Sequence, residues 1–579
     1  MTPSMDAAVR LRIAAAATAI VLATLGVYWQ TWEHAFTVFD DPLYVTGNSR
    51  VLGGLSWENI RWAFAAPDAF LWHPLTWLSY MASADAHGAT SAGPWVMTDV
   101  LLHALGAVLL LIVLTRMTGR VAPAAFVAAL FALHPLQSEP VAWVSGRKDV
   151  LAGLFCMLTL LAWLAWVRRP HAARYAAVLA AFALCLSAKS SLVALPVVLL
   201  ALDFWPLKRL EARAQLAPRI AEKLPLLALS LASVAIQLAF VARSWNVWIE
   251  DPPLPDRIAG AAMGIVAMLG RIVWPFDLAI VRPTPAQMGL AFWSPVELIL
   301  TGAGLLGITI AATLCARWSR PVLVGWIWFL ALLLPMSGLL PAGLRVMHDR
   351  YGYVPMIGIA IAAAHGAAEL AGRHRSRRAL LGSLGVALIV CSAWLTTRQV
   401  AVWQDSLTLF DHALRVTERN AIVHYSRGVA LAGSGQIDRA IADFRTALSI
   451  YPRHPDANTS LGWLLDQRGH HDQALPHLRL AVEARPGWIL ALTNLANALI
   501  DAGEREEALM WLERAVETEP GSPNSCYRLG KALERAGRID AAEAQYRQAL
   551  RIDPHHPHAK LALMAVERTR RIQEETSER

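Results

Sequence analysis

The apolar stretch LRIAAAATAIVLATLGVYWQTW, residues 11–32, decides the class of this fold. Its length matches the roughly 20 residues that a helix needs to cross about 30 Å of bilayer hydrocarbon. Because Arg10 and Arg12 lie at its start, it could also be a cleaved signal peptide. It leads into many further apolar runs, however, so we interpret it as a retained signal anchor and as the first span of a polytopic membrane protein.

Apolar runs recur as far as residue 397 and then stop. The composition agrees with a membrane protein that carries a polar appendage: 56% of the 579 residues are hydrophobic, 17% are charged and the mean hydropathy is +0.40. We therefore predict an all-α protein that begins with a polytopic helical membrane domain. After the first run, the others lie at residues 96–115, 121–138, 149–167, 174–188, 190–205, 224–242, 258–274, 296–316, 321–341, 354–371 and 379–397.

Basic residues between the runs predict the topology, because cytoplasmic loops are enriched in Lys and Arg. The basic loops require an even number of crossings between Lys208 and Arg317, whereas three apolar runs separate them. We assign 258–274 as the run that does not cross, since it is short and precedes WPFDLAIVRPTP. The chain then crosses about 11 times, with its N-terminus in the cytoplasm and its C-terminal part outside. Membrane topology explains the net charge of +8 better than nucleic-acid binding does.

A 34-residue repeat fills the polar C-terminal part. This period, with small residues at fixed positions and a closing proline, is typical of tetratricopeptide repeats. We predict four full repeats over about 421–556 within a repeat domain at 399–570, which follows a membrane domain at 1–398 and precedes a polar tail at 571–579. WQDSLTLFDHAL, residues 403–414, is interpreted as the second helix of a degenerate repeat. The in-phase residues are Pro452, Pro486, Pro520 and Pro554, then Ala440, Ala474, Ala508 and Ala542, and finally Ala447, Ala481, Ala515 and Ala549.

The connection between the first two spans, residues 33–95, is far longer than usual, which predicts a function for it. It begins with TVFDDPLYV, residues 37–45, in which Asp40 and Asp41 are adjacent. Like charges side by side cost free energy where the dielectric is low. The pair is therefore either solvated at the membrane interface or part of a catalytic site. The other outer loops favour the catalytic interpretation.

Two further outer loops are rich in charge. LHPLQSEPVAWVSGRKDVLAG, residues 133–153, carries Glu139 and Arg147, and LRVMHDRYGYVP, residues 344–355, carries Arg345, His348 and Arg350. Lys189 lies between two runs and could join them. Carboxylates suit the removal of a proton from a hydroxyl, and arginines suit the binding of a phosphate leaving group. The alternatives are an interfacial ion-pair cluster at Arg147–Asp149 and a helix-end cap or ion pair at Asp349–Arg350.

The order of these motifs carries a resemblance to a known family. FDDPLYVTGNSRV, HPLTWLSY, HPLQSEPVAWVSGRKDVLAGLF and DRYGYVP, followed by tetratricopeptide repeats, resemble the transmembrane and tetratricopeptide-repeat O-mannosyltransferases and their bacterial relatives, which belong to the GT-C superfamily. The resemblance covers nearly the whole chain. It departs from the commonest motifs at His73, where relatives often have Arg, and at Asp99, where Asn is common.

The resemblance implies a glycosyltransferase of a bacterial inner membrane, with its site and its repeats on the outer face. It would move a sugar, mannose in the family, from a polyprenyl phosphate to Ser or Thr hydroxyls of exported proteins, with inversion. The candidate catalytic residues are Asp40, Asp41 and Glu139. The candidates for binding the donor phosphate are Arg350, Arg147, Arg345, His348 and Lys189. The repeats would hold the acceptor, with Asn494, Asn497 and Tyr527 as candidates.

The sequence also allows two other functions and the binding of a divalent metal. Repeats anchored by spans could form a non-catalytic scaffold for envelope assembly, but about 11 crossings exceed what an anchor needs. A lipid-linked glycan flippase, polymerase or transferase with a non-protein acceptor is the other option. No cofactor and no dedicated metal site is predicted, although Asp40, Asp41 and Glu139 could hold a divalent metal as hard oxygen ligands.

Overall fold

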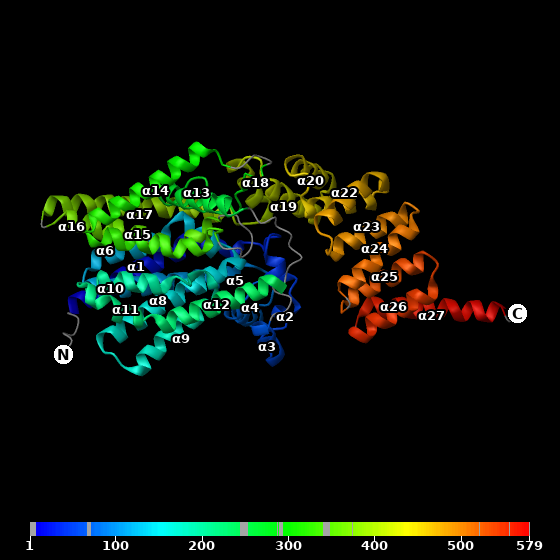
Figure 1. Ribbon diagram of the computed structural model, residues 1–579, viewed down its shortest axis with the longest axis horizontal. Coiled ribbons are helices and arrows are strands. Elements are labelled where there is room, and N and C mark those ends of the chain that lie inside the picture. Colours follow the sequence, from blue (N-terminus) through cyan, green and yellow to red (C-terminus); the bar gives the residue numbers. More distant parts are fainter. Residues whose placement is uncertain are drawn as a thin grey trace. The chain divides into compact units, whose positions relative to one another are not determined.

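The computed structural model describes residues 7–65, 71–243, 253–285, 288, 293–339, 348–372, 374–519, 521–554 and 556–577. Within these ranges the chain forms helices joined by turns and has no strand, which confirms the all-α class (Figure 1). It divides into two compact units. The membrane unit ends at Glu418, and the repeat unit consists mainly of the residues from Arg419 onward.

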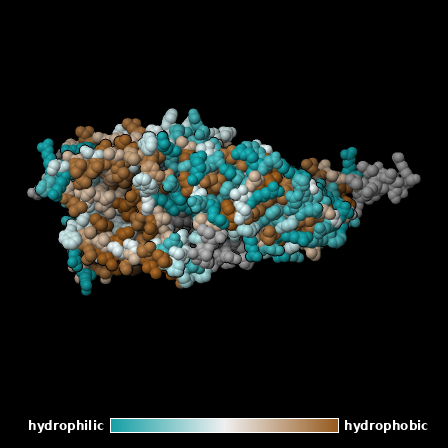
Figure 2. Space-filling view, turned by 90° about the horizontal axis from the view of Figure 1, so that it is seen from above, coloured by the Kyte–Doolittle hydropathy of each residue, from teal (hydrophilic) through white to brown (hydrophobic). Residues whose placement is uncertain are grey.

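Six helices in the described part of the membrane unit are long and apolar enough to cross a bilayer. Hydrophobic residues cover much of the face of this unit seen in Figure 2, as lipid-facing helices require. Exposed apolar side chains such as Ile299 on α14 and Leu384 on α17 belong to this surface. The six are α1 (Ala7–Tyr28, continued by η1, Trp29–Glu33), α5 (Gly93–Thr118), α8 (Arg147–Arg168), α12 (Leu224–Arg243), α14 (Pro295–Cys315) and α17 (Arg375–Ala401).

Shorter apolar helices complete the unit. The bent pair α6 (Val121–Leu133) and α7 (Ser138–Ala142) qualifies as one broken span or as a re-entrant loop. The about 11 predicted crossings are reached only if this pair and the four shorter helices also cross, so that number stays a prediction. These four are α9 (Ala172–Ala188), α10 (Leu195–Phe204), α15 (Arg320–Leu333) and α16 (Met356–Leu370). The remaining helices are α2 (Ser49–Leu52), α3 (Trp57–Ala65), α4 (Pro74–His87), α11 (Leu216–Ala221), α13 (Leu254–Val273) and α18 (Ser406–Val416).

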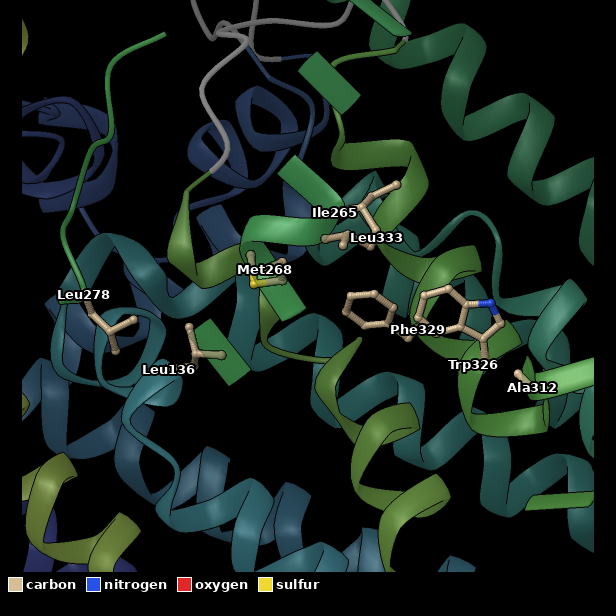
Figure 3. Packing of buried hydrophobic residues seen from close by; sticks show 8 residues of the cluster. All are labelled: Leu136, Ile265, Met268, Leu278, Ala312, Trp326, Phe329 and Leu333. Atoms are coloured by element: carbon tan, nitrogen blue, oxygen red, sulfur yellow. The ribbon is translucent and has the colours of Figure 1, made fainter. Parts of the chain in front are cut away.

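Helix α13, which covers the run that we excluded from the crossings, is amphipathic. It carries charged residues in its first and last turns, and it is not among the helices of the described chain that qualify as spans. Ile265 and Met268 on its buried face point toward Phe329 and Leu333 of α15, and Leu136 lies on the other side of Met268 (Figure 3). A one-sided apolar face suits a helix that lies on a protein surface and not within lipid on all sides. This core lies next to the 348–353 loop, because Gly352 is in contact with Met268.

Helices α15 and α16 cross at two glycines. A Cβ atom on Gly325 would lie 2.2 Å from the carbonyl oxygen of Gly358, and one on Gly358 would lie 2.3 Å from that of Gly325. In a membrane, where the hydrophobic effect does not drive helices together, small residues favour association by allowing the backbones to come this close. The crossing fixes the start of α16 and therefore the loop that precedes it.

We expect Gly325→Ala to destabilise the membrane unit by about 1–3 kcal/mol, because the added methyl must push the two backbones apart. Gly304→Ala on α14 is the matched control, since a Cβ there meets nothing within 4 Å. Thermal unfolding of both variants in detergent measures the difference. Equal melting temperatures would show that the crossing tolerates separation.

Pro135 causes the bend between α6 and α7, which is 51°. The residue before a proline avoids the α conformation, so α6 ends at Leu133 and His134 is extended. The imidazole of His134 then accepts a hydrogen bond from the amide of Leu136 at 3.2 Å, and its other nitrogen is 3.0 Å from the carbonyl of Ile272 at the end of α13. This local structure directs the chain into α7 and thereby positions Glu139.

Four helix pairs between Ala421 and Ile552 form most of the repeat unit, whose visible face is mainly hydrophilic (Figure 2). The alanines at the two repeated positions are all completely buried, as close helix packing requires. Gly435, Gly469, Gly503 and Gly537, also 34 residues apart, have positive φ angles of 77–91° at the turn inside each pair. The pairs are α19 (Ala421–Gly433) with α20 (Ile437–Ile450), α21 (Pro455–Gln467) with α22 (His471–Ala484), α23 (Ile489–Asp501) with α24 (Arg505–Thr518), and α25 (Pro523–Arg535) with α26 (Ile539–Ile552), followed by α27 (Pro557–Ser577).

Candidate functional site

Asp41 is a buried structural group that joins the first two of the three charged loops. One carboxylate oxygen accepts hydrogen bonds from the amide and hydroxyl of Thr37, at 2.7 and 3.0 Å. The other accepts from the amide and hydroxyl of Ser145 in the second loop, at 3.2 and 2.5 Å. Burial raises the pKa of Asp41 to about 6, and the hydrogen bonds from Ser145 and Thr37 act in the opposite direction. With both oxygens engaged, this carboxylate holds the loop in place.

Asp40 is less buried than its neighbour Asp41 and is not held by hydrogen bonds from described residues. Its carboxylate is half-buried and forms no side-chain hydrogen bond or ion pair with any other residue in the described part of the chain. Its negative charge acts on Lys148 and Arg350, so it lies within electrostatic reach of both. A carboxylate that is accessible and unoccupied can accept a proton from a bound hydroxyl.

Arg350 joins the second and third loops through Glu139. Its guanidinium donates to one oxygen of Glu139 at 2.7 Å, and its backbone amide donates to the other oxygen at 2.9 Å. The guanidinium also lies 5.2 Å from the ring centre of Trp143, and its buried Nε has no hydrogen-bond partner in the described chain. Both oxygens of Glu139 are thus bound to Arg350, so Glu139 positions this arginine. A catalytic base needs an unpaired carboxylate, which Glu139 does not offer.

Two lysines lie beside this arginine. Lys148 places its Nζ 4.1 Å from the ring centre of Tyr44, and Lys189 pairs with Asp149 at 2.5 Å and lies 5.2 Å from the ring centre of Tyr351. Burial lowers the pKa of Lys189 to about 8, and the charge of Asp149 opposes this effect. The two lysines and Arg350 act on one another electrostatically. Arg350 and Lys189 each pair with one carboxylate, whereas Lys148 forms no ion pair within the described part of the chain. The three cations therefore lie together, with Asp40 as the nearby unpaired carboxylate.

Helix α4 supports the site from the first loop. Thr76 donates to the carbonyl of Ala188 at 2.9 Å, next to Lys189, and Tyr80 donates to the carbonyl of Val144 at 2.9 Å. His73, at the start of α4, stacks on Trp77 with ring centres 4.9 Å apart, and its buried Nε2 has no partner in the described chain. Burial lowers the pKa of His73 well below its usual value, and Lys148 adds to this effect. His73 is therefore a neutral side chain among cations.

The structure corrects the expected role of Arg147. Its guanidinium is completely buried, pairs with Asp99 at 2.6 Å, and donates to Ser83, to Ser79 and to the carbonyl of Trp95. Because all of its nitrogens are engaged inside the protein, none is free for a phosphate. Arg147 and Asp99 instead form a buried structural pair between α8 and α5.

The third loop contains two further structural groups. His348 contacts the carbonyl of Ile280 through Nδ1 at 2.8 Å, which fixes the 278–281 segment. Asp349 pairs with Arg271 of α13 at 2.9 Å, so the alternative of an Asp349–Arg350 ion pair is wrong. Arg345 lies outside the described residues.

The three acceptor candidates lie in the repeat unit. Asn494 and Asn497 are half-buried on α23, and neither side chain forms a hydrogen bond with another described residue. Tyr527 on α25 is near Tyr546 and His556, with ring centres 6.0 and 5.4 Å away. The two asparagines are available to bind a peptide, whereas Tyr527 has aromatic neighbours in its own unit.

The carboxylates do not gather into a metal site. Among the described residues no group of three or more His, Cys, Asp or Glu side chains could hold an ion. Glu139 is bound to Arg350, and both oxygens of Asp41 accept hydrogen bonds from the protein. The arrangement therefore gives a base and a cationic surface, which suit proton removal and phosphate binding.

Sequence reasoning located the loops but missed several of their members. Ser145 and Tyr44 carry no charge, and Lys148 stood within a group that is equally typical of an interfacial ion-pair cluster. The contacts of Ser145 with Asp41 and of Lys148 with Tyr44 are long-range in sequence. The glycine in VSGRKD, Gly146, is a signal in the sequence for the tight turn of the second loop. A Cβ atom at this position would lie 2.4 Å from the carbonyl oxygen of Pro140, so the turn requires a residue without a side chain.

Comparisons with known proteins agree with the motifs. Models of the tetratricopeptide repeat match residues 403–452, 425–487, 467–525 and 499–566. The chain is 25% identical over 517 residues to the human protein O-mannosyl-transferase TMTC1, which covers 78% of this chain and 57% of that protein. It is also 25% identical over 465 residues to human TMTC4, which covers 70% of this chain and 62% of that protein. The chain thus matches less than two thirds of either relative.

A solved structure of YrrB, described as a tetratricopeptide-repeat protein with an unusual peptide-binding site, is 26% identical, covers 27% of this chain and 80% of its own, and has a TM-score of 0.25. The resemblance to the transmembrane and tetratricopeptide-repeat O-mannosyltransferases is confirmed by the two human relatives.

Proposed function

We propose that this protein is a membrane mannosyltransferase that glycosylates Ser or Thr hydroxyls of exported proteins. The donor is mannose linked to a polyprenyl phosphate, and the reaction takes place on the outer face of a bacterial inner membrane. The relatives named as protein O-mannosyl-transferases support the reaction class. One observation carries the proposal for this chain: the unengaged carboxylate of Asp40 lies near a cluster of cations.

The reaction is a single displacement. The acceptor hydroxyl oxygen attacks the anomeric carbon, and Asp40 takes the hydroxyl proton. The bond between the anomeric carbon and the phosphate oxygen breaks, and polyprenyl phosphate leaves with the bonding electron pair. Arg350, Lys148 and Lys189 stabilise the charge that grows on this leaving group. Attack from the side opposite to the leaving group inverts the anomeric configuration.

A transfer assay tests the proposal. Purified protein in detergent is incubated with radiolabelled polyprenyl-phosphate mannose and a Ser/Thr-rich peptide, and label on the peptide is measured. We expect mannosylated peptide and the release of polyprenyl phosphate. Label that appears only on a lipid-linked glycan would favour a non-protein acceptor, and no transfer under any condition would favour the scaffold.

The proposal places the site and the repeats on the outer face, and this predicts a labelling pattern. In a variant without the native cysteines, Gln467→Cys at the exposed end of α21 in the repeat unit is expected to react with a membrane-impermeant thiol reagent in intact spheroplasts. Arg169→Cys, exposed in the basic loop between α8 and α9, is the matched control and should react only after lysis. The reverse pattern would invert the topology.

A further inference from the structure

The segment after the last span, residues 403–412, lies against the loop that carries the Asp pair. The amide of Ala35 donates to the carbonyl of Gln404 at 2.9 Å, and the amide of Val38 donates to the hydroxyl of Ser406 at 3.0 Å. The ring centres of Phe39 and Phe410 are 6.5 Å apart. Two backbone amides and one side chain of the 35–41 segment are thus fixed by residues more than 360 positions later in the chain.

The same segment also supports the second loop. Trp403 is buried and stacks on Trp143, with ring centres 5.5 Å apart. Trp143 in turn donates to the hydroxyl of Thr37 at 3.1 Å, and the guanidinium of Arg350 lies over its ring. Trp403 therefore supports both Thr37, which holds Asp41, and the ring against which Arg350 lies.

Helix α18 reaches the third loop as well. His412 contacts the carbonyl of Leu278 at 3.0 Å, and the next amide, that of Ala279, donates to Asp349 at 2.8 Å. One short segment is thus in contact with the supports of all three loops that form the site. Among the described helices that follow α17, only α18 belongs to the membrane unit, which ends at Glu418.

These contacts were unexpected, because the sequence of this segment is that of a repeat. A tetratricopeptide model matches residues 403–452, and the sequence predicts the second helix of a degenerate repeat here. In the structure, α18 packs within the membrane unit, and Phe410 and Ala413, which occupy repeat positions, are completely buried there. The repeat-like helix has therefore acquired contacts that a helix of the repeat array does not need.

We infer that Trp403, Ser406 and Phe410 are positioning residues for Asp40 and Arg350, so that the active site is completed by the segment that begins the repeats. The inference rests on the proposed function of Asp40 and Arg350. Asp40 forms no side-chain bond of its own to a described residue, so its position depends on the backbone of residues 35–41. Ser406 fixes that backbone at Val38, two residues before Asp40. A displacement of about 1 Å can lower the rate by about 10²-fold.

Ser406→Ala tests this in the full-length protein, because it removes the acceptor of the Val38 amide. We expect kcat for transfer to fall about tenfold or more, with a much smaller change in KM for the donor. Ser406→Thr keeps the hydroxyl and should restore kcat. Arg415→Ala, an exposed residue of the same helix, is the matched control and should transfer like the wild type. Melting in detergent separates this effect from unfolding, since a structural role alone would lower melting and would not lower kcat selectively.

Hydrogen exchange provides a readout that does not depend on transfer. The amide of Val38 should exchange faster in Ser406→Ala than in Arg415→Ala or the wild type, because only the first variant lacks its acceptor. If the wild type transfers no mannose, the proposed function fails, while faster exchange still supports the anchoring by α18. If the wild type transfers and Ser406→Ala keeps the wild-type kcat, or if the exchange of Val38 is unchanged, the inference is overturned.

Discussion

We expect Asp40→Asn to lower the turnover of mannose transfer by about 10²-fold or more, while the protein still inserts and melts like the wild type. Asn has the size of Asp but cannot accept the hydroxyl proton, and general-base catalysis contributes about 10²–10⁴-fold. Because the Asp40 side chain is half-buried and forms no hydrogen bond with a described residue, its replacement breaks no side-chain hydrogen bond within the described part of the chain. Transfer kinetics and thermal melting in detergent are measured on the same preparations.

Asp41→Asn is the matched control, since the same chemical change is made one residue away. The amide NH₂ of Asn cannot accept the hydrogen bonds that one oxygen of Asp41 receives, and each buried donor left without a partner costs about 1–3 kcal/mol. We expect a lower melting temperature and a loss of activity that follows the loss of folded protein. The opposite result, an inactive and stable Asp41→Asn with an active Asp40→Asn, would exchange the roles of the two residues.

The sequence predicted the repeats well, because their packing is encoded within 34 residues. Ala440 and Ala447 are buried by the packing of helices within the repeat array itself. The 34-residue period is therefore sufficient to locate these buried positions. The exclusion of run 258–274, now α13, from the crossings could also be predicted, since the positions of the basic loops along the chain indicated that one run does not cross. These features depend on local pattern and not on which loops meet.

The roles of individual charged residues could not be predicted, because they depend on contacts across long stretches of sequence. Asp40 and Asp41 are indistinguishable as neighbours, and only the second loop, through Ser145, shows which is engaged. Arg147 and Arg350 are equally plausible phosphate ligands by residue type, but Asp99, two serines and a carbonyl group engage all nitrogens of the first. Helix α18 has the sequence of a repeat, and its place in the membrane unit follows from tertiary contacts alone.

The second large effect is expected at Arg350. As the bond to the anomeric carbon breaks, the phosphate gains charge, so a fixed guanidinium stabilises the transition state more than the ground state. Arg350→Ala should lower kcat by about 10²–10³-fold, whereas Arg350→Lys should keep part of the activity because it retains the charge but loses the planar fork. The difficulty is that Arg350 is also the buried partner of Glu139. Removing one member of such a pair leaves an uncompensated charge, which costs about 3–5 kcal/mol.

A double variant separates the two roles. Arg350→Ala combined with Glu139→Gln removes both charges, so no uncompensated charge is buried and stability should recover relative to Arg350→Ala alone. If Arg350 binds the donor phosphate, transfer stays low in the double variant although melting recovers. If Arg350 serves only to hold Glu139 and the fold, transfer should recover together with melting. Glu139→Gln alone completes the cycle, and we expect it to lower activity less than Arg350→Ala, because the guanidinium remains beside Trp143 and keeps its charge.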